Sequence, residues 1–176
     1  AKHYPESTCK KHFQVMKELG FELPKVKFKQ GKRFNREQIL SEEQVLRVIT
    51  QFINPRYRLV SLVSAYSGLR LKNVVHLKRS EVNLKDGWLN IKSQSKTGKP
   101  VSIPITPGLR KVFKWIKVWP LRNEDRFFPN VSEKPISVQV GRAFKKAGIP
   151  WGAFHHFRHF AACELINNGV PLEVVR

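Results

Sequence analysis

The sequence predicts an α+β domain that is mostly helical and contains one small antiparallel sheet. Apolar residues recur at intervals of three and four through most of residues 36–168, which is the period of helices packed on a core. Residues 88–91 and 101–105 instead alternate with a period of two, which predicts paired strands. With 176 residues, 41% of them hydrophobic, the chain is long enough for one domain with a real core.

A capping box predicts the first helix of this domain. Ser41 is suited to the N-cap position, and Gln44 is placed to reach back to the Ser41 backbone. Two more helices are predicted over residues 58–67, with Gly68 as the stop, and over residues 71–78. The first helix has an inward apolar stripe formed by Val45, Val48, Ile49 and Phe52.

Further helices are predicted after the sheet. The two strands pair around a turn at residues 96–99, and Thr106-Pro107 begins the next helix. A helix is then expected from Ser137 to Gly148, another from about His155 to Asn168, and Pro171 opens one more. The helix after Pro107 has an apolar face formed by Leu109, Val112, Phe113, Ile116 and Trp119.

The chain divides near residue 36, so residues 1–35 are expected to be separate from the main domain at 36–176. Residues 8–20 have apolar positions at helical spacing and predict one helix. The basic segment that follows has no clear period and ends on Lys32 and Arg33. It is either a solvated linker or a segment that binds along the phosphates of a nucleic acid, and the two interpretations are compatible.

The charge of the chain is its most unusual property. Lys and Arg number 33 against 13 Asp and Glu, a formal net charge of +20, which indicates a polyanionic partner such as a nucleic-acid backbone. The longest apolar stretches, such as Leu59–Tyr66, are too short to span a bilayer, so no membrane partner is expected. Cys9 and Cys163 suggest no disulfide framework, which favours a cytoplasmic, nucleic-acid-associated protein.

Four side chains have the chemistry to act on a phosphodiester. Arg70 and Arg158 can each donate bidentate hydrogen bonds to the charge that develops on the non-bridging oxygens. Lys96, in the predicted turn, is a cation that could protonate a departing 5′ oxygen. His155 lies three residues before Arg158, so both share one face of a helix, and its near-neutral pKa suits proton exchange.

Each of these residues also has an ordinary alternative. Arg70 can simply begin a helix, Lys96 and Lys99 can be solvated turn residues, and the histidines can be surface or core residues. His155, His159 and Cys163 recur every four residues, so they could also share a face as metal ligands. No second ligand cluster appears elsewhere in the sequence, and we expect no metal.

The arrangement of the segments is more specific than any one of them. The segments Leu40–Glu43, Tyr66–Arg70, Leu77–Val82, Ser95–Lys99 and Phe154–His159 follow one another in a fixed order at fitting distances. In this order they resemble the catalytic domain of the tyrosine recombinases, the phage integrase family. The resemblance covers about residue 40 to the end, and it is closer than the resemblance to a type IB topoisomerase.

The resemblance implies a site-specific recombinase that cleaves double-stranded DNA through a 3′-phosphotyrosyl link. Arg70 and Arg158 would clamp the phosphate, His155 would assist proton transfer, and Lys96 would be the general acid, with Lys99 as the alternative. It also implies a homotetramer on paired DNA sites and no cofactor. Residues 1–35 would be the end of a DNA-clamping domain. The expected DNA contacts are Lys32, Arg33, Lys72, Lys99 and His159.

Two departures from the family pattern limit these expectations. The family usually has an acidic residue three positions after the first arginine, where this chain has Asn73. The nucleophilic tyrosine is expected after Val175, and Tyr4, Tyr57 and Tyr66 do not replace it. We therefore expect the chain to bind DNA but to be inactive alone, with the tyrosine supplied by a longer parent or a neighbouring subunit. The alternatives are a catalytically silent DNA-binding protein of the same fold and a basic RNA-binding module.

Overall fold

The computed structural model describes residues 38–92, 98, 100–117 and 125–170. The chain divides into two units, Ala1–Asn35 and Arg36–Arg176, and the described residues belong to the second. The predicted helix at 8–20, the turn at 96–99 apart from Gly98, the position of Trp119 and the helix after Pro171 lie outside the described residues.

The predicted capping box is present at the start of α2 (Glu42–Thr50). Gln44 N donates to Ser41 Oγ at 3.2 Å, and Ser41 N donates to Gln44 Oε1 at 2.9 Å. The whole predicted stripe is buried, although Phe52 lies just beyond the end of the helix.

The next two helices differ from the sequence prediction at their ends. Helix α3 (Pro55–Ser67) begins earlier than predicted, because Asn54 accepts a hydrogen bond from Arg56 N and Pro55 is pre-set for the first turn. Helix α4 (Leu71–Val75) is shorter than predicted. Just beyond its end, Leu77 O accepts a hydrogen bond from Phe127 N at 3.0 Å, a tertiary contact that the sequence pattern does not show.

The sheet has three strands in the order β1-β2-β3, one more than predicted. β2 (Trp88–Ile91) pairs antiparallel with β3 (Val101–Pro104) in a register that sets Leu89 opposite Ile103. β1 (Val82–Asn83) was missed because two residues are too few for a period to show, and it follows a single 3₁₀ turn, η2 (Arg79–Glu81).

Three longer helices complete the described part of the chain. Helix α5 (Pro107–Lys117) begins as predicted, with Leu109 N donating to Thr106 Oγ1 at 3.3 Å. Helix α6 (Glu133–Lys146) begins earlier than Ser137, because Pro135 is tolerated in a first helical turn. Helix α7 (Phe154–Asn167) ends before Gly169, which has φ +82°.

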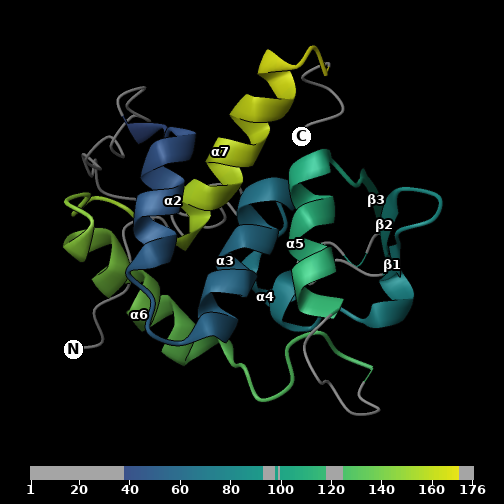
Figure 1. Ribbon diagram of the computed structural model, residues 1–176, viewed down its shortest axis with the longest axis horizontal. Coiled ribbons are helices and arrows are strands. Elements are labelled where there is room, and N and C mark those ends of the chain that lie inside the picture. The colour runs from purple at the N-terminus through teal and green to yellow at the C-terminus, as the bar shows by residue number, and fades with distance from the viewer. Residues whose placement is uncertain (1–37, 93–97, 99, 118–124, 171–176) are drawn as a thin grey trace, which may run out of the picture. The chain divides into compact units, whose positions relative to one another are not determined.

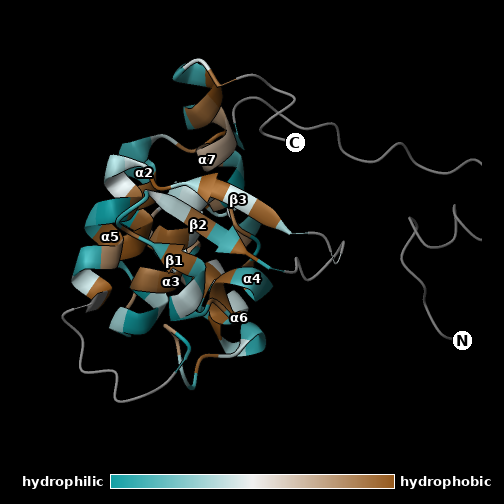
Figure 2. Cartoon of the chain, turned by 90° about the vertical axis from the view of Figure 1, so that its right-hand side faces the viewer, coloured by the Kyte–Doolittle hydropathy of each residue, from teal (hydrophilic) through white to brown (hydrophobic). Residues whose placement is uncertain are grey.

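Helix α3 lies at the centre of the domain and contacts α2, α4, α5 and α7 (Figure 1). Every residue from Leu59 to Ala65 is buried, which explains why this helix lacks a single apolar stripe. The three strands lie at one edge of this unit with the helices to one side of them (Figure 1), and in the turned view the sheet lies in front of the helices (Figure 2). Among the described residues no helix is long and apolar enough to cross a membrane.

Candidate functional site

The site begins at the turn between α3 and α4. Gly68 ends α3 with φ +68°, a left-handed conformation that glycine adopts at little cost. Ser67 Oγ accepts from Leu69 N at 3.2 Å, and Ser64 Oγ donates to Leu69 O at 2.9 Å. These two serine contacts fix the backbone on both sides of the turn, and they set Arg70 at the N-cap of α4.

Arg158 reaches this turn from the first half of α7. Its Nη1 donates to the Gly68 carbonyl oxygen at 2.5 Å, although the two residues are 90 positions apart. Burial, and then the neighbouring positive charge of Arg70, lower the pKa of Arg158. The two arginines predicted to clamp a phosphate are therefore brought close enough for their charges to interact, and an anion placed between them would relieve that repulsion.

The three histidines at the start of α7 have different environments. His155 is exposed, His156 is 5% exposed, and His159 is half-buried. Their ring centroids are 4.0 Å apart for His155 and His156, and 5.5 Å apart for His155 and His159. Burial and the charge of His155 lower the pKa of both His156 and His159, which favours their neutral forms. Of the three, His155 is the one whose side chain is exposed to solvent.

Tyr66 occupies a packing position, as predicted. Its hydroxyl donates to Glu42 Oε1 at 3.0 Å, and its ring meets Phe160 of α7 edge-on at 6.3 Å. Burial, and then the Glu42 hydrogen bond, raise the pKa of Tyr66 to about 12. A phenol that is hard to ionise and already bonded to a carboxylate is a poor nucleophile, so the hydroxyl ties α3 to α2.

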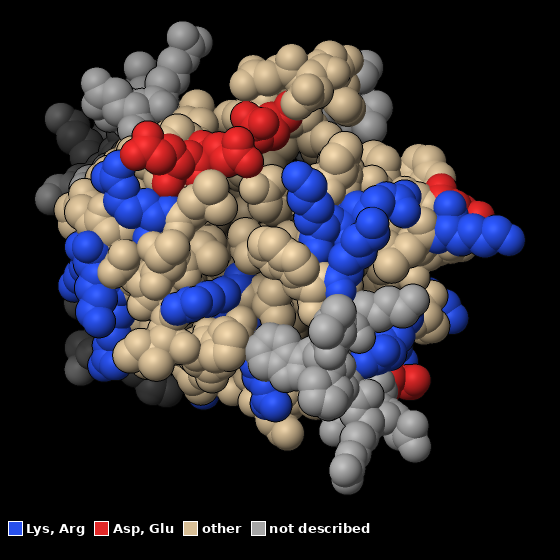
Figure 3. Space-filling model, viewed as in Figure 1, with Lys and Arg blue, Asp and Glu red and all other residues tan. Residues whose placement is uncertain are grey.

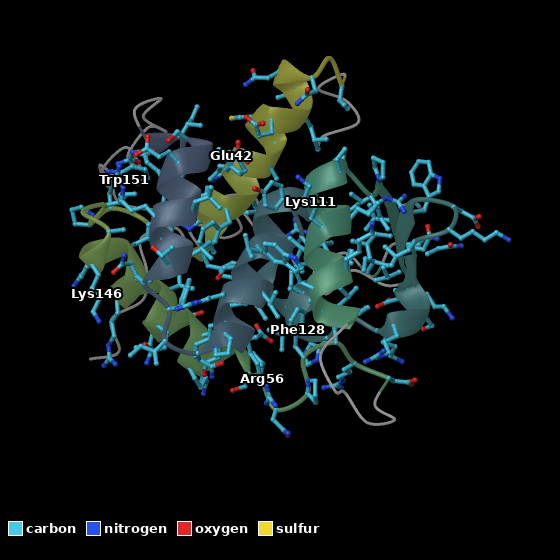
Figure 4. The ribbon with its side chains drawn as sticks, viewed as in Figure 1. Glu42, Arg56, Lys111, Phe128, Lys146 and Trp151 are labelled. Carbon is cyan, nitrogen blue, oxygen red and sulfur yellow. The ribbon has the colours of Figure 1, made fainter. Side chains whose placement is uncertain are left out.

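Acidic and basic side chains occupy different parts of the surface. Acidic side chains form a band over α2 and α7, which contribute Glu42, Glu43 and Glu164, whereas Lys and Arg lie over α5 and much of the rest of this face (Figure 3). Figure 4 places Lys111 on α5. Within α7, His155 and Glu164 lie toward opposite ends of the helix.

The remaining predicted site residues are placed only in part. Lys72 is exposed on α4, and Asn73, at the position where an acid was expected, is 7% exposed. Lys32, Arg33, Lys96 and Lys99 lie outside the described residues.

Comparison with known proteins assigns the family. The model of the phage integrase family matches residues 38–176. The chain belongs to the phage integrase family. Tyrosine recombinase XerA of Pyrococcus horikoshii is 25% identical over an alignment of 145 positions, and the match covers 78% of this chain and 50% of that protein. This phage integrase chain thus spans about half the length of the curated relative.

Solved structures share the fold of this integrase domain. A dimer of lambda integrase residues 75–356 bound to a COC' core site superposes with a TM-score of 0.69 at 19% identity, covering 93% of this chain and 63% of that one. A lambda integrase tetramer bound to a Holliday junction also gives 0.69 at 19% identity, covering 97% and 53%. These structures confirm the predicted α+β fold, and the family match confirms the predicted membership of the phage integrase family.

The described residues contain no group of three His, Cys, Asp or Glu that could hold a metal ion, the predicted alternative set of His155, His159 and Cys163 included. Cys163 is half-buried, and burial followed by the charge of Glu164 raises its pKa, which keeps the thiol protonated.

Two parts of the site could not be read from the integrase sequence. The sequence predicted Gly68 only as the end of a helix. Its carbonyl oxygen as the acceptor for Arg158 could not be predicted, because every residue has a backbone carbonyl and it leaves no signal in the sequence. His156 accepts a hydrogen bond from Ala153 N at 2.9 Å. Its position three residues after the helix boundary was the available signal, since that is where a side chain can reach back to the N-cap backbone.

Proposed function

We propose that this chain is the catalytic domain of a site-specific recombinase that cleaves and rejoins double-stranded DNA in the cytoplasm. The observation that supports this most directly is the hydrogen bond from Arg158 to the Gly68 carbonyl. It brings the histidine-arginine segment of α7 beside the turn that carries Arg70. Two guanidiniums held close together are suited to a scissile phosphate, because they stabilise charge that increases in the transition state.

The proposed reaction has two steps, cleavage of one DNA strand and rejoining to another. A tyrosine oxygen attacks phosphorus, the bond to the 5′ oxygen breaks, and that oxygen takes a proton from Lys96, or from Lys99 if the hairpin register is shifted. Arg70 and Arg158 hold the non-bridging oxygens, and His155 exchanges the tyrosine proton. In the reverse step a 5′ hydroxyl of the partner strand gives its proton to the general acid and attacks phosphorus, the bond to the tyrosine oxygen breaks, and that oxygen regains its proton from His155, so no external energy source is needed.

The nucleophile is proposed to come from outside these residues. The hydrogen bond of Tyr66 to Glu42 and its raised pKa argue against Tyr66 in that role. The lambda integrase tetramer on a Holliday junction, which shares the fold, supports a homotetramer that exchanges strands between two DNA sites. Lys72, Lys32, Arg33, Lys99 and His159 would contribute DNA contacts around this centre.

The deciding experiment uses the product of the complete gene and a nicked DNA duplex that traps the covalent intermediate. Wild-type protein should form a covalent adduct, and peptide mapping of that adduct should identify the tyrosine. Arg70→Ala and Arg158→Ala should each lower adduct formation at least about 100-fold, whereas DNA affinity should change little. Lys111→Ala, exposed on α5, is the matched control and should behave as wild type. An adduct mapped to Tyr66 would overturn the assignment of the nucleophile.

A catalytically silent DNA-binding protein is the second candidate. The buried Asn73, where a carboxylate was expected, favours it. This candidate predicts salt-dependent DNA binding, no adduct from wild-type protein, and equal loss of binding for Arg70→Ala and a remote lysine variant. If RNA competes for that binding as well as duplex DNA does, the basic RNA-binding module is favoured instead.

A further inference from the structure

We propose that His156 is a positioning residue that holds the His155 imidazole in place by ring stacking from a buried, anchored ring. This inference rests on the proposed function of His155 in proton transfer. His155 is exposed, and an exposed side chain is free to change rotamer unless a neighbour restrains it. The two ring centroids are 4.0 Å apart with an interplanar angle of 35°, so His156 is in direct contact with it.

The His156 ring is anchored by a hydrogen bond to the helix boundary. Ala153 N donates to His156 Nδ1 at 2.9 Å, which is the contact that Glu or Gln usually makes in a capping box. His156 Nδ1 also lies 3.3 Å from the Ala153 carbonyl oxygen, and the shorter contact, in which Nδ1 accepts, corresponds to the neutral tautomer with its proton on Nε2. The side chain of Ala153 cannot cap the helix, so the capping contact at this end comes from His156.

Aromatic residues from outside α7 enclose the same ring. Trp151 meets His156 at 5.0 Å with an interplanar angle of 71°, and Phe144 of α6 meets it at 6.3 Å and 63°. Phe144 is fully buried, so this side of the enclosure belongs to the domain core. Trp151 lies in the connection from α6 to α7 (Figure 4). His156 is therefore fixed on one side by the core and faces His155 on the other.

The charges around His156 favour its neutral form. Burial and the charge of His155 lower the pKa of His156, a hydrogen bond with the Ala153 backbone opposes them, and the charge of His159 lowers it further, whereas Phe144 and Trp151 carry no charge. A neutral ring can stay stacked on His155 when His155 takes up a proton, because no like charges then face each other. The two adjacent histidines thus have different roles, one exposed for chemistry and one buried for support.

Two variants separate the ring from the capping contact. His156→Gln retains an acceptor that can reach Ala153 N but removes the ring, whereas His156→Phe retains a ring but removes the acceptor. If stacking positions His155, His156→Gln should lower adduct formation about tenfold, and its urea midpoint should also fall because the ring contacts with Trp151 and Phe144 are lost. His156→Phe should retain adduct formation within about threefold of wild type, although its urea midpoint falls because Ala153 N loses its acceptor.

Nuclear magnetic resonance of the 176-residue chain provides a readout that needs no catalysis. The His155 Cε1 proton, assigned with a His155→Gln variant, should lose its ring-current shift in His156→Gln and keep most of it in His156→Phe. The inference is overturned if the His155 signal is unchanged in His156→Gln, or if the activity of both variants simply follows their stability. If the signal changes as expected but wild-type protein forms no adduct, the proposed function fails while the packing role of His156 stands.

Discussion

Arg158 Nη1 and the Gly68 carbonyl oxygen are joined by a hydrogen bond that spans 90 positions of the chain. The bond uses one edge of the guanidinium and leaves other N–H donors of its planar fork for a ligand. It therefore fixes the direction of Arg158 from the backbone next to Arg70, so that one turn of the chain positions both arginines.

Arg158→Lys should separate charge from geometry. A lysine keeps the positive charge, but its ammonium lacks the rigid planar fork of a guanidinium. It can bind either the Gly68 carbonyl or the phosphate, whereas arginine can bind both at once in a fixed geometry. We expect adduct formation to fall by about 100-fold, with the salt dependence of DNA binding unchanged. Arg142→Lys, exposed on α6, is the matched control. Equal effects of the two variants would contradict the clamping role of Arg158.

The general acid can be assigned with DNA in which sulfur replaces the bridging 5′ oxygen. A thiolate leaves without a proton, because a thiol has a pKa of about 8.5. On ordinary DNA Lys96→Ala should lower adduct formation about 100-fold or more, and the sulfur-containing DNA should restore it. Lys99→Ala should have a small effect that sulfur does not change. The opposite pattern would assign the role to Lys99.

Tyr66→Phe should lower the free energy of unfolding by about 1 kcal/mol, because it removes the hydrogen bond to Glu42. The pKa of Tyr66 is raised from 10.0 to about 12 in the folded protein. Its contribution to stability is therefore complete below pH 10 and is lost as the pH rises toward 12. Urea unfolding of both proteins between pH 8 and roughly 11 should show the difference shrinking at the alkaline end. Adduct formation should persist in Tyr66→Phe, which a nucleophilic Tyr66 would not allow.

Two glycine-to-alanine changes should have opposite signs. At Gly152 a Cβ would lie 2.0 Å from Phe144 Cδ1, and the Phe144 ring is fully buried. Gly152→Ala should therefore destabilise the domain by about 1–3 kcal/mol or more through overpacking. At Gly141, within α6, a Cβ meets nothing within 4 Å, so Gly141→Ala should stabilise by roughly 0.5–1 kcal/mol. Thermal unfolding of the two variants measures both, and a stabilising Gly152→Ala would contradict this packing.

The sequence by itself determined the fold class, the helical stripes and the β2–β3 pair, because these follow from local periodicity, and the order of its motifs predicts that the two arginines act together. Helix ends were less well determined. Helices α3 and α6 begin earlier than predicted because of Asn54 and Pro135. Helix α4 ends earlier than predicted, next to the backbone hydrogen bond that Phe127 N donates to Leu77 O. Local propensity does not contain that tertiary pairing.

The tertiary structure alone decided how the site is assembled. Which histidine is exposed depends on what packs on each face of α7, and here Trp151 and Phe144 enclose His156 and leave His155 to solvent. The acceptor for Arg158 is a backbone carbonyl, a group that every residue carries, so its selection depends on where the Gly68 turn meets α7. The residue types therefore determine which chemistry is possible. Long-range packing determines which of several residues of the same type lies where that chemistry needs it.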